Sequence, residues 1–290
     1  MIVIKLIGGL GNQMFQYACA KAIALEHQFE LGIDNSAFKE YKVHKYLLNK
    51  FNISGNIINE KNIKIVNNIS EIRKKILNFI NKQNNRKYYS RFVEKKFDFD
   101  KNISKITDNT FMEGYFQSEK YFKKYAENIK KDFSLNYISN KTLEIAGLII
   151  NTSCSVSLHI RRGDYVSNPD ASNFHGLASL DYYYRSIEYI VLRNSNLVVF
   201  VFSDDLEWVK KNLKLKYKVK YVSHNDDENA QEDLYLMSLC KHNIIANSTF
   251  SWWGAWLNSN KEKIVIAPKE WFKNKEMNVK DLIPEEWICL

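Results

Sequence analysis

The chain has 290 residues, 45% of them hydrophobic, which suits one large or two medium domains and excludes a disordered protein. Its formal net charge of +9 fits phosphate-bearing substrates, nucleic acid or an anionic membrane, although the lysines are scattered and form no single block. The four cysteines stand far apart without a CxxC pair, so neither a disulfide framework nor a zinc site is predicted, and three in apolar contexts are expected in the core.

The first 34 residues predict a βαβ unit. An apolar strand at 2–7 is followed by a glycine-rich turn at 8–12, a helix at 13–26 with Asn12 as its N-cap, and a strand at 29–33. The apolar run at 2–7 is too short for a signal peptide or a membrane span. We therefore expect a cytoplasmic protein that is at most peripheral to the inner membrane.

The turn itself reads GGLGNQ over residues 8–13. It lacks the third glycine of a dinucleotide-binding fingerprint and the lysine of a P-loop. Its backbone can approach an anion or sugar hydroxyls closely at the start of a helix, or it can be a tight structural turn. The residues alone leave both interpretations open.

Residues 40–145 are harder to interpret, with helical spacing of apolar residues in 72–80 and 121–129 and a strand with a turn at 110–117. The remainder of the chain alternates clearly between strands and helices. Strands are predicted at 155–160, 197–203, 219–223, 243–246 and 263–267, and helices at 181–193, 205–213, 229–242 and 249–258. This alternation predicts a doubly wound parallel α/β sheet, in which ligands bind beyond the carboxyl ends of the strands.

The segment HIRRGDY, residues 159–165, follows the strand predicted at 155–160. Adjacent arginines usually lie on the surface, but these leave a buried strand beside His159 and Asp164, where ligands bind. A guanidinium group keeps its charge and offers a rigid fork of donors that matches a phosphate. The position of Arg161 and Arg162 therefore predicts a phosphate site.

The segment NSTFSWWGAW, residues 247–256, begins another predicted helix. Ser248 and Thr249 can cap this helix, whose first amides and dipole suit a pyrophosphate, and Phe250 can lie against a flat base. We interpret the three tryptophans of the segment as the buried apolar face of the helix.

Two acidic pairs follow other predicted strands. Ser203 or Asp204 of the FSDD turn can be a simple N-cap, and Glu232-Asp233 lies in the first turn of a helix, where negative charge is favourable anyway. Either pair can instead contact a nucleotide. The histidines show no metal-ligand spacing and are expected to be structural or solvent-facing: His27, His44, His175 and His224.

Taken in order, GGLGNQ, HIRRGDY, FSDD and NSTFSWW resemble the α-1,2-fucosyltransferases of bacteria and animals, glycosyltransferase family 11. GYFQS, residues 114–118, looks like the bacterial members, whereas about 40–110 are not covered. The resemblance implies a GT-B-like fold of two Rossmann-like domains, with 1–150 on the acceptor side and 151–290 binding GDP-fucose. It further implies inverting transfer of L-fucose from GDP-β-L-fucose to an oligosaccharide acceptor, at O-2 of a terminal galactose, as in lipopolysaccharide biosynthesis, without a metal or other cofactor.

The resemblance also assigns roles to individual residues. Arg161 looks like the arginine on the donor β-phosphate, Arg162 supports the site, and His159 lies near the guanine. Asp233 resembles the acid that holds guanine N–H groups, and Asn12 the loop asparagine near the transferred fucose. The phosphate and base contacts of the last motif match Ser248, Thr249 and Phe250.

Cleavage of the fucosyl–phosphate bond builds negative charge on GDP, which Arg161 and helix-end amides would stabilise. A base for the acceptor hydroxyl can be Asp164, Asp170, His175 or a residue of the N-terminal domain, and the sequence does not choose between them.

Three alternative functions remain open: another nucleotide-sugar transferase, a protein O-fucosyltransferase, and a non-enzymatic sugar- or nucleotide-binding module. Nucleic-acid binding is not expected, because polar motifs rather than exposed aromatics gather at strand ends. Weak peripheral contact with a membrane stays open.

Overall fold

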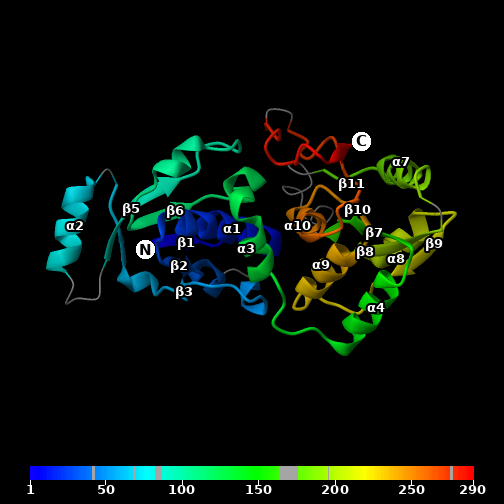
Figure 1. Ribbon diagram of the computed structural model, residues 1–290, viewed down its shortest axis with the longest axis horizontal. Coiled ribbons are helices and arrows are strands. Elements are labelled where there is room, and N and C mark those ends of the chain that lie inside the picture. Colours follow the sequence, from blue (N-terminus) through cyan, green and yellow to red (C-terminus); the bar gives the residue numbers. More distant parts are fainter. Residues whose placement is uncertain (41–42, 68, 82–86, 164–175, 195, 275–276) are drawn as a thin grey trace. The chain divides into compact units, whose positions relative to one another are not determined.

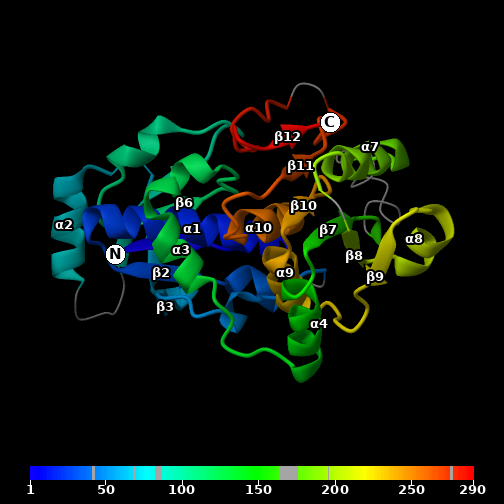
Figure 2. The same ribbon diagram turned by 45° about the vertical axis from the view of Figure 1, so that its right-hand side comes forward.

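The computed structural model describes residues 1–40, 43–67, 69–81, 87–163, 176–194, 196–274 and 277–290. The chain divides into two compact units, Met1–Ser134 with Lys280–Leu282 and Leu135–Val279 with Ile283–Leu290 (Figures 1 and 2). Each unit is built on a parallel sheet with helices, which confirms the predicted α/β class.

The first unit contains a six-stranded sheet in the order β3-β2-β1-β6-β5-β4, and every neighbouring pair is parallel. Its strands are β1 (Ile2–Lys5), β2 (Leu31–Asp34), β3 (Asn56–Ile57), β4 (Ile63–Ile65), β5 (Lys87–Val93) and β6 (Thr110–Glu113), and its α-helices are α1 (Leu10–His27), α2 (Glu71–Ile80) and α3 (Ala126–Asp132). Short 3₁₀ turns connect them at Ser36–Lys39, Leu48–Lys50, Glu60–Asn62, Lys101–Lys105, Glu119–Tyr121 and Lys123–Tyr125. Strands β1 and β6 lie side by side at the centre of this sheet.

The second unit also has a six-stranded sheet that is parallel throughout, but in the different order β12-β11-β10-β7-β8-β9. Its strands are β7 (Cys154–Ile160), β8 (Leu197–Ser203), β9 (Lys218–Tyr221), β10 (His242–Ile244), β11 (Val265–Ala267) and β12 (Ile288–Cys289), and its helices are α4 (Asn140–Ile150), α7 (Leu180–Val191), α8 (Leu206–Asn212), α9 (Ala230–Leu239) and α10 (Thr249–Leu257). This is the strand order of a dinucleotide-binding fold, and its topological switch point lies between β7 and β10.

Helix α4 belongs to the second unit because Ala146 and Ile149 pack into a core cluster with Phe200, Phe202 and neighbouring residues. The compact units therefore separate before α4, earlier in the chain than residue 150. The assignment of an acceptor side and a donor side to the two halves stays a prediction.

The predicted core residues are buried. Trp252 and Trp253 have no exposed surface and Trp256 retains 7%, which confirms that the tryptophans form the buried face of α10. Cys19, Cys154 and Cys240 are buried as expected, whereas Cys289 is exposed, and all four cysteines are free. Within the described ranges, no helix combines the length and apolar character needed to cross a membrane.

Two predicted helix caps are wrong. Helix α1 begins at Leu10 with Gly9 as its N-cap, so Asn12 lies inside the first turn, where its side chain is used for a contact with another loop. Helix α8 is capped by Asp205, whose carboxylate accepts a hydrogen bond from the backbone N–H of Trp208, rather than by Ser203 or Asp204. In both cases the sequence pattern placed the start of the helix one to three residues away from its observed position, and the predicted cap was therefore wrong as well.

Candidate functional site

Strand β7 holds His159 in the interior of the second unit. The imidazole is 5% exposed, and its ring centroid lies 5.7 Å from that of Phe250 at the start of α10. Burial, together with the positive charge of Arg161, lowers the pKa of His159 to about 3, so the ring is neutral at physiological pH. Its Nδ1 has no hydrogen-bond partner among the described residues. A buried nitrogen of this kind can take a partner from a bound ligand.

The two arginines that follow β7 are held by the acidic turn that follows β8. Arg161 Nη1 lies 3.0 Å from Asp204 Oδ2, and Arg162 Nε lies 3.2 Å from Asp205 Oδ2. The Arg162 guanidinium also lies 3.6 Å above the ring of Trp208, so this side chain is fixed on two sides. These pairs form because β7 and β8 are parallel neighbours, whose register places Ile160 opposite Ser203.

The FSDD turn thus has a role that the sequence did not suggest, because its acids position the arginines. Asp204 Oδ1 also accepts a hydrogen bond of 2.8 Å from the backbone N–H of Arg162. Gly163 leaves room for this carboxylate, since a Cβ at this position would approach Asp204 Oδ2 to 2.7 Å and displace it. The first residues after β7 are therefore held tightly against the turn after β8.

A hollow of about 240 Å³ opens beside these arginines, at the carboxyl end of β7. Its walls come from the end of β7, the start of α7 and Trp208 of α8: Ile160, Arg161, Arg162, Leu177, Ala178, Ser179, Leu180, Tyr183 and Trp208. Parallel sheets bind ligands at the carboxyl ends of their strands, so this hollow is a candidate substrate site.

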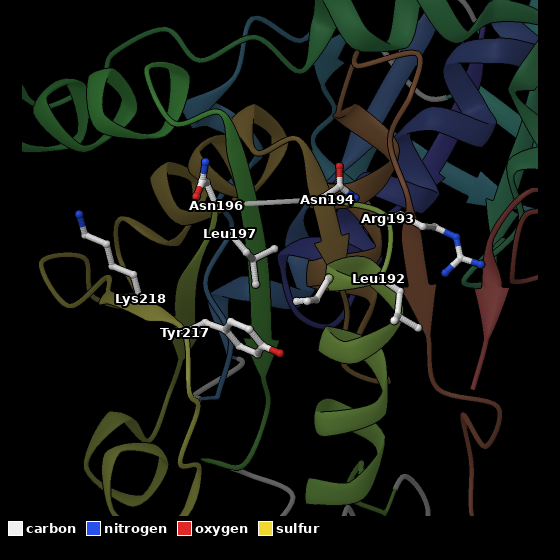
Figure 3. A pocket seen from close by; sticks show the side chains of 8 residues that line it. Leu192, Arg193, Asn194, Asn196, Leu197, Tyr217 and Lys218 are labelled. Atoms are coloured by element: carbon white, nitrogen blue, oxygen red, sulfur yellow. The ribbon is translucent and has the colours of Figure 1, made fainter.

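A larger hollow of about 610 Å³ lies elsewhere on the second unit (Figure 3). It is lined by the end of α7 and the starts of β8 and β9, including Leu192, Arg193, Asn194, Asn196, Leu197, Tyr217 and Lys218. This is the edge at which the strands begin, opposite to the edge that carries the motifs. We therefore do not assign the site to it, in spite of its volume.

The loop after β10 lies on the other side of the switch point between β7 and β10. Ser248, 8% exposed, is the N-cap of α10, and its Oγ accepts a hydrogen bond of 3.4 Å from the backbone N–H of Phe250. Thr249 and Phe250 are half-buried in the first turn of the helix. The buried tryptophans anchor this helix: Trp252 contacts Trp253, Trp256 and Trp287. The first turn of α10 is thus firmly held, with Phe250 turned toward His159.

The two acids in the first turn of α9 have different surroundings. Glu232 is buried and accepts hydrogen bonds from the backbone N–H and the Oγ of Ser139, the N-cap of α4. Asp233 accepts a hydrogen bond of 2.6 Å from Asn225 Nδ2. Burial raises the pKa of Asp233 to about 6; the Asn225 bond lowers it and the nearby Glu232 charge raises it further. Glu232 therefore braces α4, whereas Asp233 is the member of the pair suited to a ligand.

In the first unit, the loops after β1 and β6 are linked where these two strands lie side by side. Gln117 Nε2 donates a hydrogen bond of 2.8 Å to Asn12 Oδ1. Gln16 accepts from the Ile7 backbone N–H at 3.0 Å and donates to the Gly114 carbonyl at 3.1 Å. The link orients the Asn12 amide, because with its oxygen engaged by Gln117 its nitrogen is left as the donor.

Glycine is required in the first of these loops. Gly8 adopts a left-handed φ of 78°, and a Cβ there would lie 2.7 Å from Asn12 Nδ2. Gln13 is fully buried and ties the same loop to a later segment, since its Nε2 donates to the carbonyls of Gly8 and Lys45. The GGLGNQ loop is therefore both a tight turn and the support of Asn12.

The turn after β6 is held by a carboxylate that the sequence interpretation missed. Glu94 accepts hydrogen bonds from the backbone N–H groups of Tyr115 and Phe116. Burial raises the pKa of Glu94, an effect that these two bonds oppose. Phe116 is buried at a left-handed φ of 52°, a conformation that is unfavourable outside glycine and needs such support. Only the GYFQS segment offered a signal for this turn, through Gln117.

The structure thus gathers His159, Arg161, Arg162 and the first turn of α10 at one edge of the second sheet, with Asp233 in the helix that follows β9. Three candidate bases, Asp164, Asp170 and His175, lie outside the described residues. Of the remaining histidines, His27 stacks on Phe29 and His224 Nε2 lies 2.7 Å from Thr142 Oγ1, both structural contacts. In the part of the chain that is described, no group of three or more His, Cys, Asp or Glu residues is placed to hold a metal ion.

Comparison with known proteins identifies the family. Residues 1–290 match the model described as Glycosyl transferase family 11. The chain is 40% identical over 300 residues to the alpha-1,2-colitosyltransferase of Escherichia coli, covering 99% of this chain and 98% of that protein. It is 36% identical over 302 residues to the O-antigen biosynthesis glycosyltransferase WbnK of Escherichia coli, covering 98% and 99%.

Among solved structures, that of POFUT1 in complex with GDP-fucose aligns with a TM-score of 0.52 at 14% identity, covering 91% of this chain and 96% of that one. At this identity the similarity shows the fold alone, and it agrees with the two parallel sheets described above. The match of the family model to the whole chain and the identity to two bacterial relatives show the family. The chain belongs to glycosyl transferase family 11.

Proposed function

We propose that this glycosyltransferase moves L-fucose from GDP-β-L-fucose, with inversion, to O-2 of a terminal galactose in an oligosaccharide acceptor. The observation that carries the proposal is the set of side chains at the carboxyl edge of the second sheet. Arg161 supplies a fixed cation for a diphosphate, the neutral His159 faces the aromatic ring of Phe250, and Asp233 supplies a carboxylate for guanine N–H groups. The O-antigen relative supports a role in lipopolysaccharide biosynthesis.

Arg161 and the amides at the start of α10 would stabilise charge on the departing GDP. Negative charge grows on the diphosphate as the fucosyl–phosphate bond breaks, so groups held in place beforehand bind the transition state better than the ground state. Asp204 and the buried tryptophans provide this rigidity. With cationic and backbone donors in this role, we propose that the reaction needs no divalent metal.

Asn12 would act on the sugar rather than on the nucleotide. Gln117 engages its amide oxygen, so the amide nitrogen is directed as a donor toward a hydroxyl or an oxygen of the transferred sugar. The base that accepts the proton of the attacking hydroxyl is proposed to be Asp164, Asp170, His175 or a residue of the first unit. Weak contact of the protein with a membrane surface is also part of the proposal.

A second donor, GDP-colitose, is favoured by one observation, the 40% identity to an alpha-1,2-colitosyltransferase. Colitose is L-fucose without its 3-hydroxyl group. A site that hydrogen-bonds this hydroxyl should discriminate by roughly 10⁴-fold, whereas an apolar surface there would discriminate by only about 10²-fold. The ratio of kcat/KM for the two donors therefore identifies the natural one.

The test is release of nucleoside diphosphate from GDP-fucose, GDP-colitose, GDP-mannose and UDP-galactose, with a terminal β-galactoside as acceptor. GDP-fucose should give the highest kcat/KM, and blocking the acceptor as its 2-O-methyl galactoside should abolish transfer. Preference for GDP-colitose would correct the sugar, preference for a UDP-sugar would refute the nucleotide site, and normal transfer to the blocked acceptor would refute the linkage.

A further inference from the structure

Helix α2 of the first unit has a strongly apolar face that points into solvent. Ile72, Ile76, Phe79 and Ile80 are 73%, 52%, 82% and 67% exposed. At about 100° per residue these four side chains lie within one arc of roughly 100°. A surface helix ordinarily turns such a face toward the core. Both views place α2 at the outer edge of its unit (Figures 1 and 2).

The face of α2 that packs on the sheet is polar instead. Lys74 is fully buried; its Nζ lies 2.7 Å from Glu71 and donates to the Asp108 carbonyl at 2.6 Å. One turn later, Asn78 exchanges two hydrogen bonds with the backbone of Tyr88 in β5. Rotating the helix to hide its isoleucines would break a buried charge contact and these bonds. The outward direction of the apolar face is therefore fixed by the fold.

Cations border this face on both sides. On the same helical wheel, the exposed Arg73 and Lys75 lie just beyond the two ends of the apolar arc. Lys64 and Lys87, exposed on the paired strands β4 and β5, add positive charge in the same region of the unit. The one carboxylate of the helix, Glu71, is paired with the buried Lys74. An apolar arc between long basic side chains matches a surface of acyl chains and anionic headgroups.

A second copy of this chain fits the face less well. A helix of ten residues is about 15 Å long and 10 Å wide, a footprint of roughly 150 Å² against the roughly 800 Å² per partner of a stable interface. Pairing two such helices would also bring Arg73 and Lys75 of each copy close to like charges. We therefore infer that the outer face of α2 is a docking surface for an anionic lipid bilayer, which assigns the proposed membrane contact to one helix and does not depend on the proposed sugar-transfer activity.

The test is flotation of the purified full-length protein with large vesicles of phosphatidylcholine containing one third phosphatidylglycerol. The double variant Ile72→Ser/Phe79→Ser should reduce the apparent partition coefficient at least tenfold, because two large apolar side chains no longer enter the interface. Arg73→Gln/Lys75→Gln should reduce it by about tenfold or more at low salt and much less at high salt. The matched control Leu148→Ser/Leu192→Ser removes two similarly exposed apolar residues from the second unit and should change nothing.

Vesicles of phosphatidylcholine alone should bind weakly. The inference is overturned if the wild-type protein does not float with anionic vesicles, or if the α2 and control variants bind equally. It is also overturned if light scattering shows a wild-type dimer that Ile72→Ser/Phe79→Ser converts to a monomer. Hydrolysis of the donor, or transfer to a soluble acceptor, should be unchanged in these variants, so failure of the sugar-transfer proposal and failure of this one are distinguishable.

Discussion

In the proposed function Asp233 binds the nucleotide, so its ionisation should link nucleotide affinity to the stability of the second unit. Burial raises its pKa to about 6 from 3.8, so between these values the folded protein keeps a proton that the unfolded chain has lost. The stability of the unliganded protein should therefore fall as pH rises through this window. At 1.36 kcal/mol per pH unit, the ionised carboxylate costs on the order of 3 kcal/mol at pH 7.

The substitution Asp233→Asn keeps the shape of the side chain and the acceptor for Asn225 but removes the charge. We expect the unliganded variant to be more stable than the wild type at pH 7.5, by up to about 3 kcal/mol, and to lose the fall in stability between pH 4 and 6. Its affinity for GDP should drop by about 1.5–3 kcal/mol, because a charged acceptor for guanine N–H groups is gone. One substitution should thus strengthen the fold and weaken the binding.

The pH dependence of GDP binding provides the sharper measurement. Protonation of a carboxyl with a pKa of about 6 should weaken wild-type binding by roughly tenfold at pH 5 relative to pH 7.5. The GDP phosphate also gains a proton near pH 6, but this affects wild type and variant alike. His159 stays neutral throughout, because its pKa is about 3. Between pH 7.5 and pH 5, calorimetry should therefore show that the wild type loses about ten times more of its GDP affinity than Asp233→Asn does.

Asp227→Asn, which alters an exposed acid in the preceding loop, is the matched control and should behave like the wild type. Urea unfolding at the same pH values gives the stability of each protein. Equal GDP affinity in Asp233→Asn and wild type would show that the carboxylate does not bind the nucleotide. A variant that is less stable than the wild type at pH 7.5 would refute the argument from burial.

Three further outcomes are expected. Arg161→Lys and Arg161→Ala should lower kcat by roughly 10²-fold or more in folded protein, since a preorganised bidentate donor to the diphosphate is lost, and near-normal turnover would remove Arg161 from the mechanism. Activity should survive excess EDTA; a loss that manganese or magnesium restores would contradict the metal-free proposal. Asn12→Ala should leave GDP affinity almost unchanged while lowering transfer, and Gln117→Ala should do the same more weakly, because Gln117 acts by orienting Asn12. If calorimetry shows that Asn12→Ala weakens GDP as much as Asp233→Asn does, Asn12 belongs to the nucleotide site instead.

Most of the second sheet was predictable from the sequence because its central strands β7, β8 and β10 are buried, whereas the short edge strand β12 was missed. Strand β8 reads as a continuous apolar run, VVFVF, and the helices that follow β8 and β10 begin with the recognisable helix-start residues Asp205 and Ser248. The first sheet was only partly predictable. Strand β5, KYYSRFV, has one buried residue among exposed and half-buried ones, and β3 has two residues, so neither produces a clear apolar run.

The candidate site was also only partly predictable from the sequence. His159 lies in the buried strand β7, Arg161 directly follows it, and Ser248 lies between the buried strand β10 and helix α10, so their place at the sheet edge followed from the pattern. The contacts of Asp204 with Arg161 and of Gln117 with Asn12 join residues that are 43 and 105 positions apart. Such pairs depend on which strands become neighbours, and local sequence does not specify that order.

The placement of the aromatic residues makes the two units spectroscopically distinct. All six tryptophans, residues 208, 252, 253, 256, 271 and 287, belong to the second unit, whereas the first contains only tyrosine and phenylalanine chromophores. Fluorescence excited at the red edge of the absorption band therefore reports on the second unit alone, while far-ultraviolet circular dichroism follows both. Comparing the two signals during denaturation tells whether the units unfold together. Since the Arg162 guanidinium stacks on Trp208, the same emission also offers a label-free signal for binding beside the arginines.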